Sequence, residues 1–546
     1  MKKRYSTAAL LLYSLVFSVP CFSTVYYVAN NGDDTHAGTI SQPFLTIQRA
    51  QTAVSAGDTV YVRGGLYSMT TAQVASYSSI WAYVTLLNKS GTSGHRINYW
   101  SYPGEQPVFD YTAITPAGFR INAFQVNASW IYIKGLEVKG VQVTITTHTQ
   151  SECFENQGSN NIYEQLRMHD GKAIGFYLTK GGNNLILNCD AWNNWDNVSE
   201  NGLGGNTDGF GCHPNKQGVG YTNNVFRGCR AWFNSDDGYD CINAFEAVTF
   251  ENCWAFYNGY TTSFSSLGDG NGFKAGGYGV STTPSVPAVI PRNTVRFCLA
   301  IRNKSNGFYS NHHLGGSNWY NNSAYNNAVN YNMLNRSADY TSDVAGYGHN
   351  LKNNLGYGGR SAEYSNIDFT LSNADTNYFN LAVTVSNADF LSTDQSLLTA
   401  ARQPDGSLPV NNFMRLVSGS DCIDKGKNVG LSFNGAAPDL GCFETAGGAR
   451  AAVTPVAAGD NNAVGLSVYP NPVGAGSMVR YQLAAGARVQ LRLYDAGGAL
   501  VGTLVSGNQG AGVQAVPLND RLVMASGLYV LQLSFNDKMA TVRFVK

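Results

Sequence analysis

The sequence is poor in charged residues and has no excess of either sign. Lysine and arginine together number 36, aspartate and glutamate also number 36, and charged residues make up 13% of the 546 positions. A chain of this kind has no general electrostatic attraction to nucleic acid. Beyond the first 23 residues it also lacks an apolar run long enough to span a membrane. We therefore expect neither nucleic-acid binding nor membrane-spanning helices.

Several familiar catalytic and metal-binding motifs are also missing. No H-E-x-x-H, C-x-x-C or G-x-S-x-G pattern occurs, and the glycine-rich run NGLGGNTDG lacks the strand and helix context of a nucleotide site. The ten cysteines become nine if a signal peptide containing Cys21 is removed. An odd number argues against a complete disulfide framework.

Composition divides the chain into four parts. Residues 1–23 combine a basic start with an apolar run, which is typical of a signal peptide, and Pro20 disfavours the alternative of a lipid anchor on Cys21. Residues 24–445 contain the repeats described next. Residues 446–464 form a small-residue linker. Residues 465–546 alternate as short strands between glycine-rich turns, which predicts a small β-sandwich.

A short phrase recurs along the largest part, as NCDAWNN, GCRAWFN, NCWAFYN, FCLAIRN and NNSAYNN. Its closing asparagines lie at positions 194, 234, 258, 303 and 327, so a base period near 24 residues receives insertions in alternate turns. Short β-rich segments at this period, without an amphipathic helical pattern between them, indicate an all-β parallel solenoid. Its turns should stack about 4.8 Å apart.

Equivalent positions in a solenoid stack as ladders along its axis. The asparagines form one ladder, in which their amides can hydrogen-bond from turn to turn. Cysteines form another, where burial in the core is favoured over metal binding or disulfides: Cys189, Cys229, Cys253 and Cys298. Beyond the clear repeats, Cys422 and Cys442 are the candidate disulfide pair.

A second phrase recurs as DGFG, DGYD, NGFK and NGFY, beginning at positions 208, 237, 271 and 306. The glycine and the aromatic residue align the four copies, so their first and fourth positions should form two neighbouring columns. This alignment predicts that Asp208 lies one turn from Asp237. It also predicts that Asp240 lies one turn from Lys274.

Three of the aspartates in this region crowd into the stretch NSDDGYDCIN, residues 234–243. With the residue from the preceding turn, four carboxylates converge: Asp208, Asp236, Asp237 and Asp240. Their repulsion is tolerable if a divalent cation neutralises it, and carboxylate oxygens suit Ca²⁺ better than a transition metal. The alternative is that these aspartates cap solvent-exposed turns.

Lys274 is the one basic residue in its phrase, GDGNGFKAGG. Beside a bound cation its ammonium form is disfavoured, which would lower its pKa and allow the neutral amine to act as a base. The alternative is a structural ion pair between Lys274 and Asp240.

These motifs resemble polysaccharide lyase family 9, the pectate lyases built on a right-handed parallel β-helix. The resemblance covers residues 24–445 and is most specific in NTDGF, NSDDGYD and GDGNGFK. It implies that Ca²⁺ binds Asp208, Asp236, Asp237 and Asp240 and that Lys274 is the catalytic base. The implied reaction is β-elimination, in which the base removes the C5 proton of a uronate and the C4 glycosidic oxygen leaves.

The resemblance leaves the substrate open, because lyases of rhamnogalacturonan are similar in fold to those of α-1,4-linked galacturonan. Two alternatives from other classes are a pectin hydrolase, for which paired aspartates would supply acid and base, and a non-enzymatic adhesin with structural calcium. His312 and His313 could line the substrate cleft, and Arg302 could pair with a substrate carboxylate, although each also suits a surface position.

The C-terminal part resembles a type IX secretion sorting domain, with YPNP at residues 469–472, SGLYVLQL at residues 526–533 and a basic end. This resemblance implies contact with the type IX secretion machinery and release from, or anchoring at, the outer cell surface. A carbohydrate-binding β-sandwich is the alternative. Capped solenoids have no physical need to associate, so we expect a monomer.

Overall fold

A computed structural model describes residues 23–147, 150–445, 466–469, 477–495, 500–518, 528–535 and 538–545. The chain divides into two compact units, residues 1–446 and 447–546. The predicted signal peptide and linker lie almost entirely outside the described residues. Among the residues that are described, no helix is long and apolar enough to cross a membrane.

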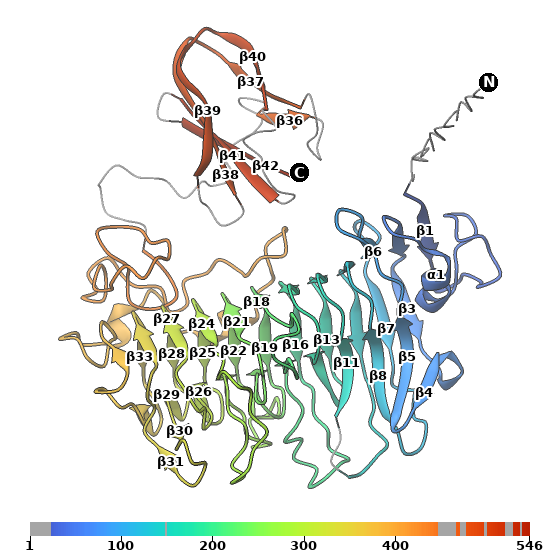
Figure 1. The fold of residues 1–546 in the computed structure, drawn as a ribbon, viewed down its shortest axis with the longest axis horizontal. Helices are drawn as coiled ribbons and strands as arrows, with labels where there is room; N and C mark the ends of the chain where they lie inside the picture. The colour runs from blue at the N-terminus through green and yellow to red at the C-terminus, as the bar shows by residue number, and fades with distance from the viewer. Residues whose placement is uncertain are drawn as a thin grey trace, which may run out of the picture. The chain divides into compact units, whose positions relative to one another are not determined.

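The first unit is a parallel β-helix of three sheets, in which strands of successive turns stack side by side (Figure 1). Sheet 1 has 12 strands: β1 (Val25–Val28), β2 (Thr59–Val62), β6 (Ile97–Ser101), β9 (Ile131–Lys134), β12 (Ile162–Glu164), β15 (Leu185–Leu187), β18 (Asn224–Arg227), β21 (Val248–Glu251), β24 (Thr294–Arg296), β27 (Asn318–Tyr320), β32 (Asn350–Lys352) and β35 (Asn373–Ala374). Sheet 2 has 10: β3 (Gly65–Ser68), β7 (Pro107–Asp110), β10 (Glu137–Lys139), β13 (Arg167–His169), β16 (Asp190–Trp192), β19 (Arg230–Trp232), β22 (Trp254–Phe256), β25 (Leu299–Ile301), β28 (Ser323–Tyr325) and β33 (Leu355–Tyr357).

Sheet 3 contains the second repeated phrase and has 11 strands. They are β4 (Ser76–Ser78), β5 (Trp81–Leu87), β8 (Arg120–Val126), β11 (Ser151–Asn156), β14 (Ala173–Leu178), β17 (Phe210–Cys212), β20 (Tyr239–Asp240), β23 (Phe273–Lys274), β26 (Asn306–Tyr309), β29 (Val329–Asn332) and β34 (Ala362–Ser365). All its pairings are parallel except β4 with β5. An antiparallel pair, β30 (Asn335–Arg336) and β31 (Asp343–Val344), lies in the loop after β29.

The N-terminal end of the core is covered by helix α1 (Ile47–Ala53). Thr46 caps this helix by accepting a hydrogen bond from the Arg49 amide, and Ile47 and Ala50 are buried. Short 3-10 turns occur at η1 (Thr71–Gln73), η2 (Asn387–Asp389) and η3 (Gln395–Thr399).

The repeated aromatic residue of the second phrase forms a continuous stack inside the β-helix. Phe210, Tyr239, Phe273 and Phe308 are fully buried, and their ring centroids lie 5.0, 4.6 and 5.2 Å apart with interplanar angles of 10° or less. Rings of one size at each turn fill the core evenly, since adjacent strands are spaced about as far apart as offset-stacked rings.

The asparagine ladder is confirmed. The amide nitrogen of each asparagine donates to the amide oxygen of the next, at 3.1, 3.1, 3.0 and 2.9 Å through Asn194, Asn234, Asn258, Asn303 and Asn327. All five side chains are fully buried. Each amide nitrogen also donates to a backbone oxygen of an earlier turn, so the ladder pairs polar groups that burial would otherwise leave unsatisfied.

The cysteine ladder is also confirmed as part of the core, since its four thiols are buried and free. The predicted disulfide between Cys422 and Cys442 is wrong, because both are free thiols in the structure. They lie in a separate apolar cluster on the outside of sheet 2, where residues after β35 pack against Phe256 and Leu299. Burial against this large apolar surface makes a covalent link unnecessary there.

The second unit contains two antiparallel sheets that share one buried apolar core, which confirms the predicted β-sandwich. One sheet consists of β36 (Ser467–Tyr469), β37 (Met478–Leu483) and β40 (Gly512–Pro517). The other consists of β39 (Leu500–Gln509), β38 (Ala487–Asp495), β41 (Leu528–Phe535) and β42 (Lys538–Val545).

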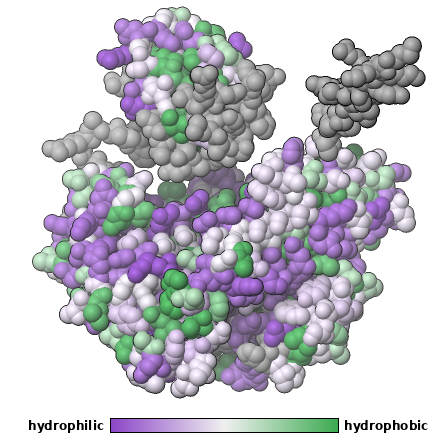
Figure 2. Space-filling view, viewed as in Figure 1, coloured by the Kyte–Doolittle hydropathy of each residue, from purple (hydrophilic) through white to green (hydrophobic). Residues whose placement is uncertain are grey.

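On the face shown in Figure 2, hydrophilic side chains predominate over hydrophobic ones, which lie in small separate groups.

Replacing one asparagine of the buried ladder should destabilise the β-helix strongly. Asn258→Ala leaves the Asn234 amide, the Asn303 amide oxygen and the Ala231 carbonyl short of a partner. We expect a loss of about 3 kcal/mol or more in the free energy of unfolding, measured by urea denaturation. As a control, Asn350→Ala removes a half-buried amide bonded to Asn318 and should cost less than about 1 kcal/mol, because water can replace it.

Thiol counting tests the cysteine assignments. In protein lacking residues 1–23, the native state should not react with a disulfide-exchange reagent, because all nine cysteines are buried. After denaturation without reductant, all nine should react. A count of seven (9 − 2) would instead indicate one disulfide, as predicted between Cys422 and Cys442.

Candidate active site

The second repeated phrase has the predicted register in sheet 3. Gly211 of β17 pairs with Asp240 of β20, Asp240 pairs with Lys274 of β23, and Lys274 pairs with Tyr309 of β26. The Asp237 amide donates a hydrogen bond of 3.1 Å to Asp208 Oδ1 one turn away. Both predicted neighbour relations are therefore confirmed.

The glycine of each phrase is required by close packing at the turn before the strand. A Cβ atom at Gly209 would lie 2.7 Å from the Ala231 side chain and 2.8 Å from the Gly238 oxygen. At Gly238 it would lie 2.8 Å from the Gly272 oxygen. These contacts are too short for any side chain, so the glycines bring the turns together, and with them the aspartates that precede each glycine.

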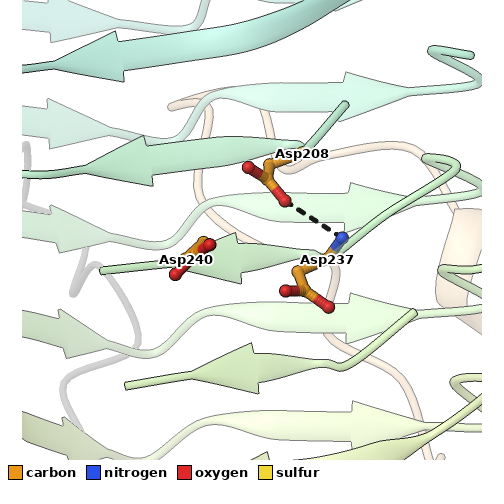
Figure 3. Close-up of side chains that lie close together, drawn as sticks. All are labelled: Asp208, Asp237 and Asp240. Atoms are coloured by element: carbon orange, nitrogen blue, oxygen red, sulfur yellow. Dashed lines mark hydrogen bonds between the residues drawn. The ribbon is translucent and has the colours of Figure 1, made fainter. Parts of the chain in front are cut away.

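Three carboxylates converge from two adjacent turns, as Figure 3 shows. One oxygen from each of Asp208, Asp237 and Asp240 lies within 4.8 Å of the other two. The side chains are almost fully buried, with exposed fractions of 3%, 0% and 4%. The interpretation of these aspartates as caps of solvent-exposed turns is therefore wrong.

Asp236, the fourth predicted metal ligand, is buried beside this group but is not one of its three members. Its Oδ1 accepts a hydrogen bond of 3.0 Å from the Asp269 amide in the next turn. Its charge still reaches the group, because it contributes to the raised pKa of Asp208. Asp269, which sequence analysis did not single out, adds negative charge near Asp236 and Asp237.

Burial and repulsion between neighbouring carboxylates raise the pKa values of Asp208, Asp236 and Asp237. Burial and the neighbouring charges of Asp236 and Asp240 raise the pKa of Asp208 well above its usual value. Burial likewise raises the pKa of Asp237 to about 6, although Lys274 opposes this shift. Ionisation of these groups therefore places negative charge in a region from which water is largely excluded, which is costly without a cation.

Lys274 faces this cluster directly. Its Nζ lies 3.1 Å from Oδ2 of Asp237 and 3.1 Å from Oδ2 of Asp240, so the ion pair considered as an alternative is present. Burial alone would lower the pKa of Lys274, but the carboxylates, Asp237 and Asp240 foremost, outweigh it and raise the pKa well above its usual value. The predicted lowering was conditional on a bound cation and stays a prediction.

The ion pair does not satisfy the cluster completely. Among the described residues, no donor makes a hydrogen bond to Asp237 Oδ2, a buried atom, because the Lys274 contact has the distance of an ion pair but not hydrogen-bond geometry. The other oxygen, Oδ1, accepts from the Asn271 backbone amide at 2.6 Å and from its side-chain amide at 2.7 Å. The cluster thus has an oxygen available to a hard cation.

The other candidate substrate-binding residues, His312, His313 and Arg302, lie in different environments. His313 is buried against the Pro291 carbonyl, and burial lowers its pKa to about 4, so it is a core residue. The Arg302 guanidinium lies 3.9 Å from the centre of the Phe264 ring. His312, by contrast, contacts Tyr309, the next residue after Lys274 in the column.

Comparisons with known proteins identify the family of this β-helix. The description "Pel9A-like, right handed beta helix region" matches residues 26–354, more than half of the chain. The chain belongs to this family. The match also confirms the predicted right-handed parallel β-helix.

Several of its relatives are polysaccharide lyases. Pectate lyase L of Dickeya chrysanthemi is 33% identical over 77% of this chain and 90% of the relative, and pectate lyase PEL9 of Emericella nidulans is 29% identical over 72% and 93%. The solved structure of pectate lyase Pel9A is 30% identical, with a TM-score of 0.62 over 77% of this chain and 96% of the other. A solved rhamnogalacturonan lyase is 45% identical, with a TM-score of 0.71 over 72% and 97%. The protein is a polysaccharide lyase.

The buried carboxylates predict an unusual dependence of stability on pH. Because Asp237 has a folded-state pKa of about 6 against an ordinary value of 3.8, the folded state binds more protons between these values. The free energy of unfolding contributed by this group should therefore fall as the pH rises from about 4 to 6, and Asp208 and Asp236 should extend the fall to higher pH. Lys274, with a raised pKa, loses its stabilising effect only at strongly alkaline pH.

Thermal unfolding with a chelator and with Ca²⁺ across pH 4–8 measures this effect. The difference in melting temperature should grow with pH, because a bound cation would cancel the repulsion that ionisation creates. Carboxylates far from the cluster change the melting temperature equally with chelator and with Ca²⁺, so they do not affect the difference between the two. Parallel curves in the two conditions would contradict the assignment of these aspartates to a cation site.

Proposed function

We propose that this protein is a calcium-dependent pectate lyase that cleaves α-1,4-linked galacturonan by β-elimination. The observation on which the proposal rests is the convergence of three buried aspartate oxygens within 4.8 Å, one turn from a single lysine. Pectate lyases among the relatives support the reaction class.

The residues of the site fit a calcium ion. Carboxylate oxygens are its preferred ligands, and Asp208, Asp237 and Asp240 would hold it, with Asp236 beside them. Among the described residues, Asp237 Oδ2 accepts no hydrogen bond, although it pairs with the Lys274 ammonium, so this oxygen would be available to the cation. When bound together with a uronate carboxylate, the cation would stabilise the negative charge that develops as the C5 proton leaves.

Lys274 is the residue that we propose accepts this proton. It lies in the same outward column as Asp240, so a uronate whose carboxylate approaches the aspartates would bring its C5 atom towards the next turn. The Lys274 side chain is 12% exposed, which leaves a path to substrate. Neutralising the aspartates would remove the attraction that keeps its amine protonated.

Replacing the proposed base should abolish turnover without preventing cation binding. Lys274→Ala should lower kcat by about 10²–10⁴-fold, measured from the ultraviolet absorbance of the unsaturated uronate product. Calcium-induced thermal stabilisation should persist in this variant, because the aspartates are unchanged. The converse variant, Asp237→Asn, should lose both properties. Substantial elimination activity in Lys274→Ala would refute the assignment of the base.

Rhamnogalacturonan is the second candidate substrate. The specific observation in its favour is the rhamnogalacturonan lyase structure, whose 45% identity exceeds the 30% of pectate lyase Pel9A. Both polymers contain galacturonate, so the same cation site and base would serve either. The choice depends on the sugars that flank the reacting residue.

A direct comparison of the two polymers decides between these substrates. Polygalacturonate and rhamnogalacturonan are incubated separately with enzyme and Ca²⁺, and then with a chelator. A calcium-dependent rise in absorbance identifies the substrate, and its loss in the chelator supports the role of the cation. New reducing ends without absorbance would instead indicate the hydrolase considered above.

We also propose that residues 465–546 direct export through the type IX secretion machinery and that the enzyme acts as a monomer outside the cell or at its outer surface. The support is the resemblance of YPNP and SGLYVLQL to sorting domains, together with a β-sandwich that is compact by itself. Residues 470–472 of the first motif and residues 526 and 527 of the second lie outside the described residues. Intact-mass analysis of exported protein would test cleavage of this unit.

A further inference from the structure

A series of hydrogen-bonded polar side chains, separate from the aspartate cluster, includes the residue one turn from Lys274. Tyr309 is the neighbour of Lys274 in the outward column of sheet 3, one turn further from Asp240. Its side chain is half-buried. Neighbouring strands of a sheet lie about 4.8 Å apart, a spacing close to the length of one pyranose in a polysaccharide. A sugar chain along this column would therefore place a second sugar near Tyr309.

The Tyr309 hydroxyl contacts His312, which lies just after β26, and His312 in turn contacts Asp343 of β31. The hydroxyl lies 3.1 Å from His312 Nε2, and His312 Nδ1 lies 2.8 Å from Asp343 Oδ1. Arg336 donates to the same Asp343 oxygen at 2.9 Å. Its other guanidinium nitrogens donate to the carbonyls of Tyr340 and Val280, so the series is anchored to two loops.

The proton positions in this series follow from the chemistry of its members. Burial raises the pKa of Asp343, but Arg336 and His312 outweigh this and lower it, so Asp343 is an ionised acceptor. Nδ1 of His312 then donates to Asp343, and this bond fixes the orientation of the ring. The Tyr309 hydroxyl is paired with Nε2 and keeps its proton, since burial, partly opposed by Lys274, raises its pKa to about 12.

The bond to Nε2 uses one hydrogen-bonding position of the Tyr309 hydroxyl, so its oxygen keeps a lone pair for a further donor. We propose that Tyr309 binds a hydroxyl group of the sugar next to the one that reacts at Lys274, and that His312 and Asp343 are positioning residues that present its oxygen as an acceptor. The inference rests on the proposed function, because it takes Lys274 as the reacting position.

The alternative is that these hydrogen bonds only stabilise the loop between β29 and β32. Tyr347, in this loop, provides a matched control. Its hydroxyl donates to the carbonyls of Arg336 in β30 and of Leu314 in the segment before β27, and Tyr347 belongs to no strand of the column. Tyr347→Phe removes a hydroxyl that only stabilises the loop. Tyr309→Phe removes a hydroxyl from the column that contains Lys274.

Binding to an inactive enzyme separates these roles. In the Lys274→Ala background with Ca²⁺, the Kd for a saturated oligosaccharide of the polymer that is cleaved is measured by calorimetry. Tyr309→Phe should raise Kd about three- to tenfold, the worth of one hydrogen bond, and Tyr347→Phe should leave it unchanged. Equal affinities with and without the Tyr309 hydroxyl would overturn the inference.

A double variant tests whether His312 acts through Tyr309. His312 has a backbone φ of 56°, a conformation that asparagine tolerates, so His312→Asn removes the ring with little strain. It should raise Kd two- to fivefold alone but have no further effect combined with Tyr309→Phe. Additive effects would show that these hydrogen bonds only stabilise the loop and would overturn the positioning role. Cleavage by Lys274→Ala would instead refute the proposed base, while the Kd comparison would still decide the role of Tyr309.

Discussion

Parallel pairing of each strand with its equivalent one turn away is the constraint on which the rest of the structure depends. This pairing stacks equivalent positions about 4.8 Å apart. A residue type that recurs in a column must therefore pack favourably against copies of itself. Aromatic rings do so by stacking, as in Phe210, Tyr239 and Phe273. Asparagine does so because its amide is both donor and acceptor. A charged residue does not, since identical charges repel along the column.

The candidate active site is the place where the repeat departs from this rule. The column that continues Gly211 changes to Asp240, then Lys274, then Tyr309, so opposite charges follow one another where like residues would otherwise stack. Asp208 and Asp237 are brought together in the turn beside it, because glycines let adjacent turns approach closely. The β-helix thus concentrates carboxylates in a buried position at the expense of stability, which a structural role alone does not require.

The loops between strands add a second layer to this site. The loop after β29 supplies Asp343, which reaches Tyr309 through His312, although these residues are 34 positions apart (343 − 309). The rigid sheet thus determines where Lys274 and Tyr309 stand, and the loop determines which hydrogen-bonding groups surround them. Differences between lyases of one fold in the sugars they accept have a natural source in such loops.

The amino-acid sequence by itself determined the solenoid, the ladders, the register of DGFG with DGYD and NGFK, and the neighbours of Lys274. These follow from repetition, since a period and an alignment are sufficient to stack equivalent residues. Only the tertiary structure decided that Asp236 lies beside the three clustered carboxylates, that Lys274 pairs with Asp237 as well as Asp240, and that Cys422 and Cys442 are free. These features depend on side-chain direction and on non-repeating segments, such as the loop with Asp343, whose path no periodicity encodes.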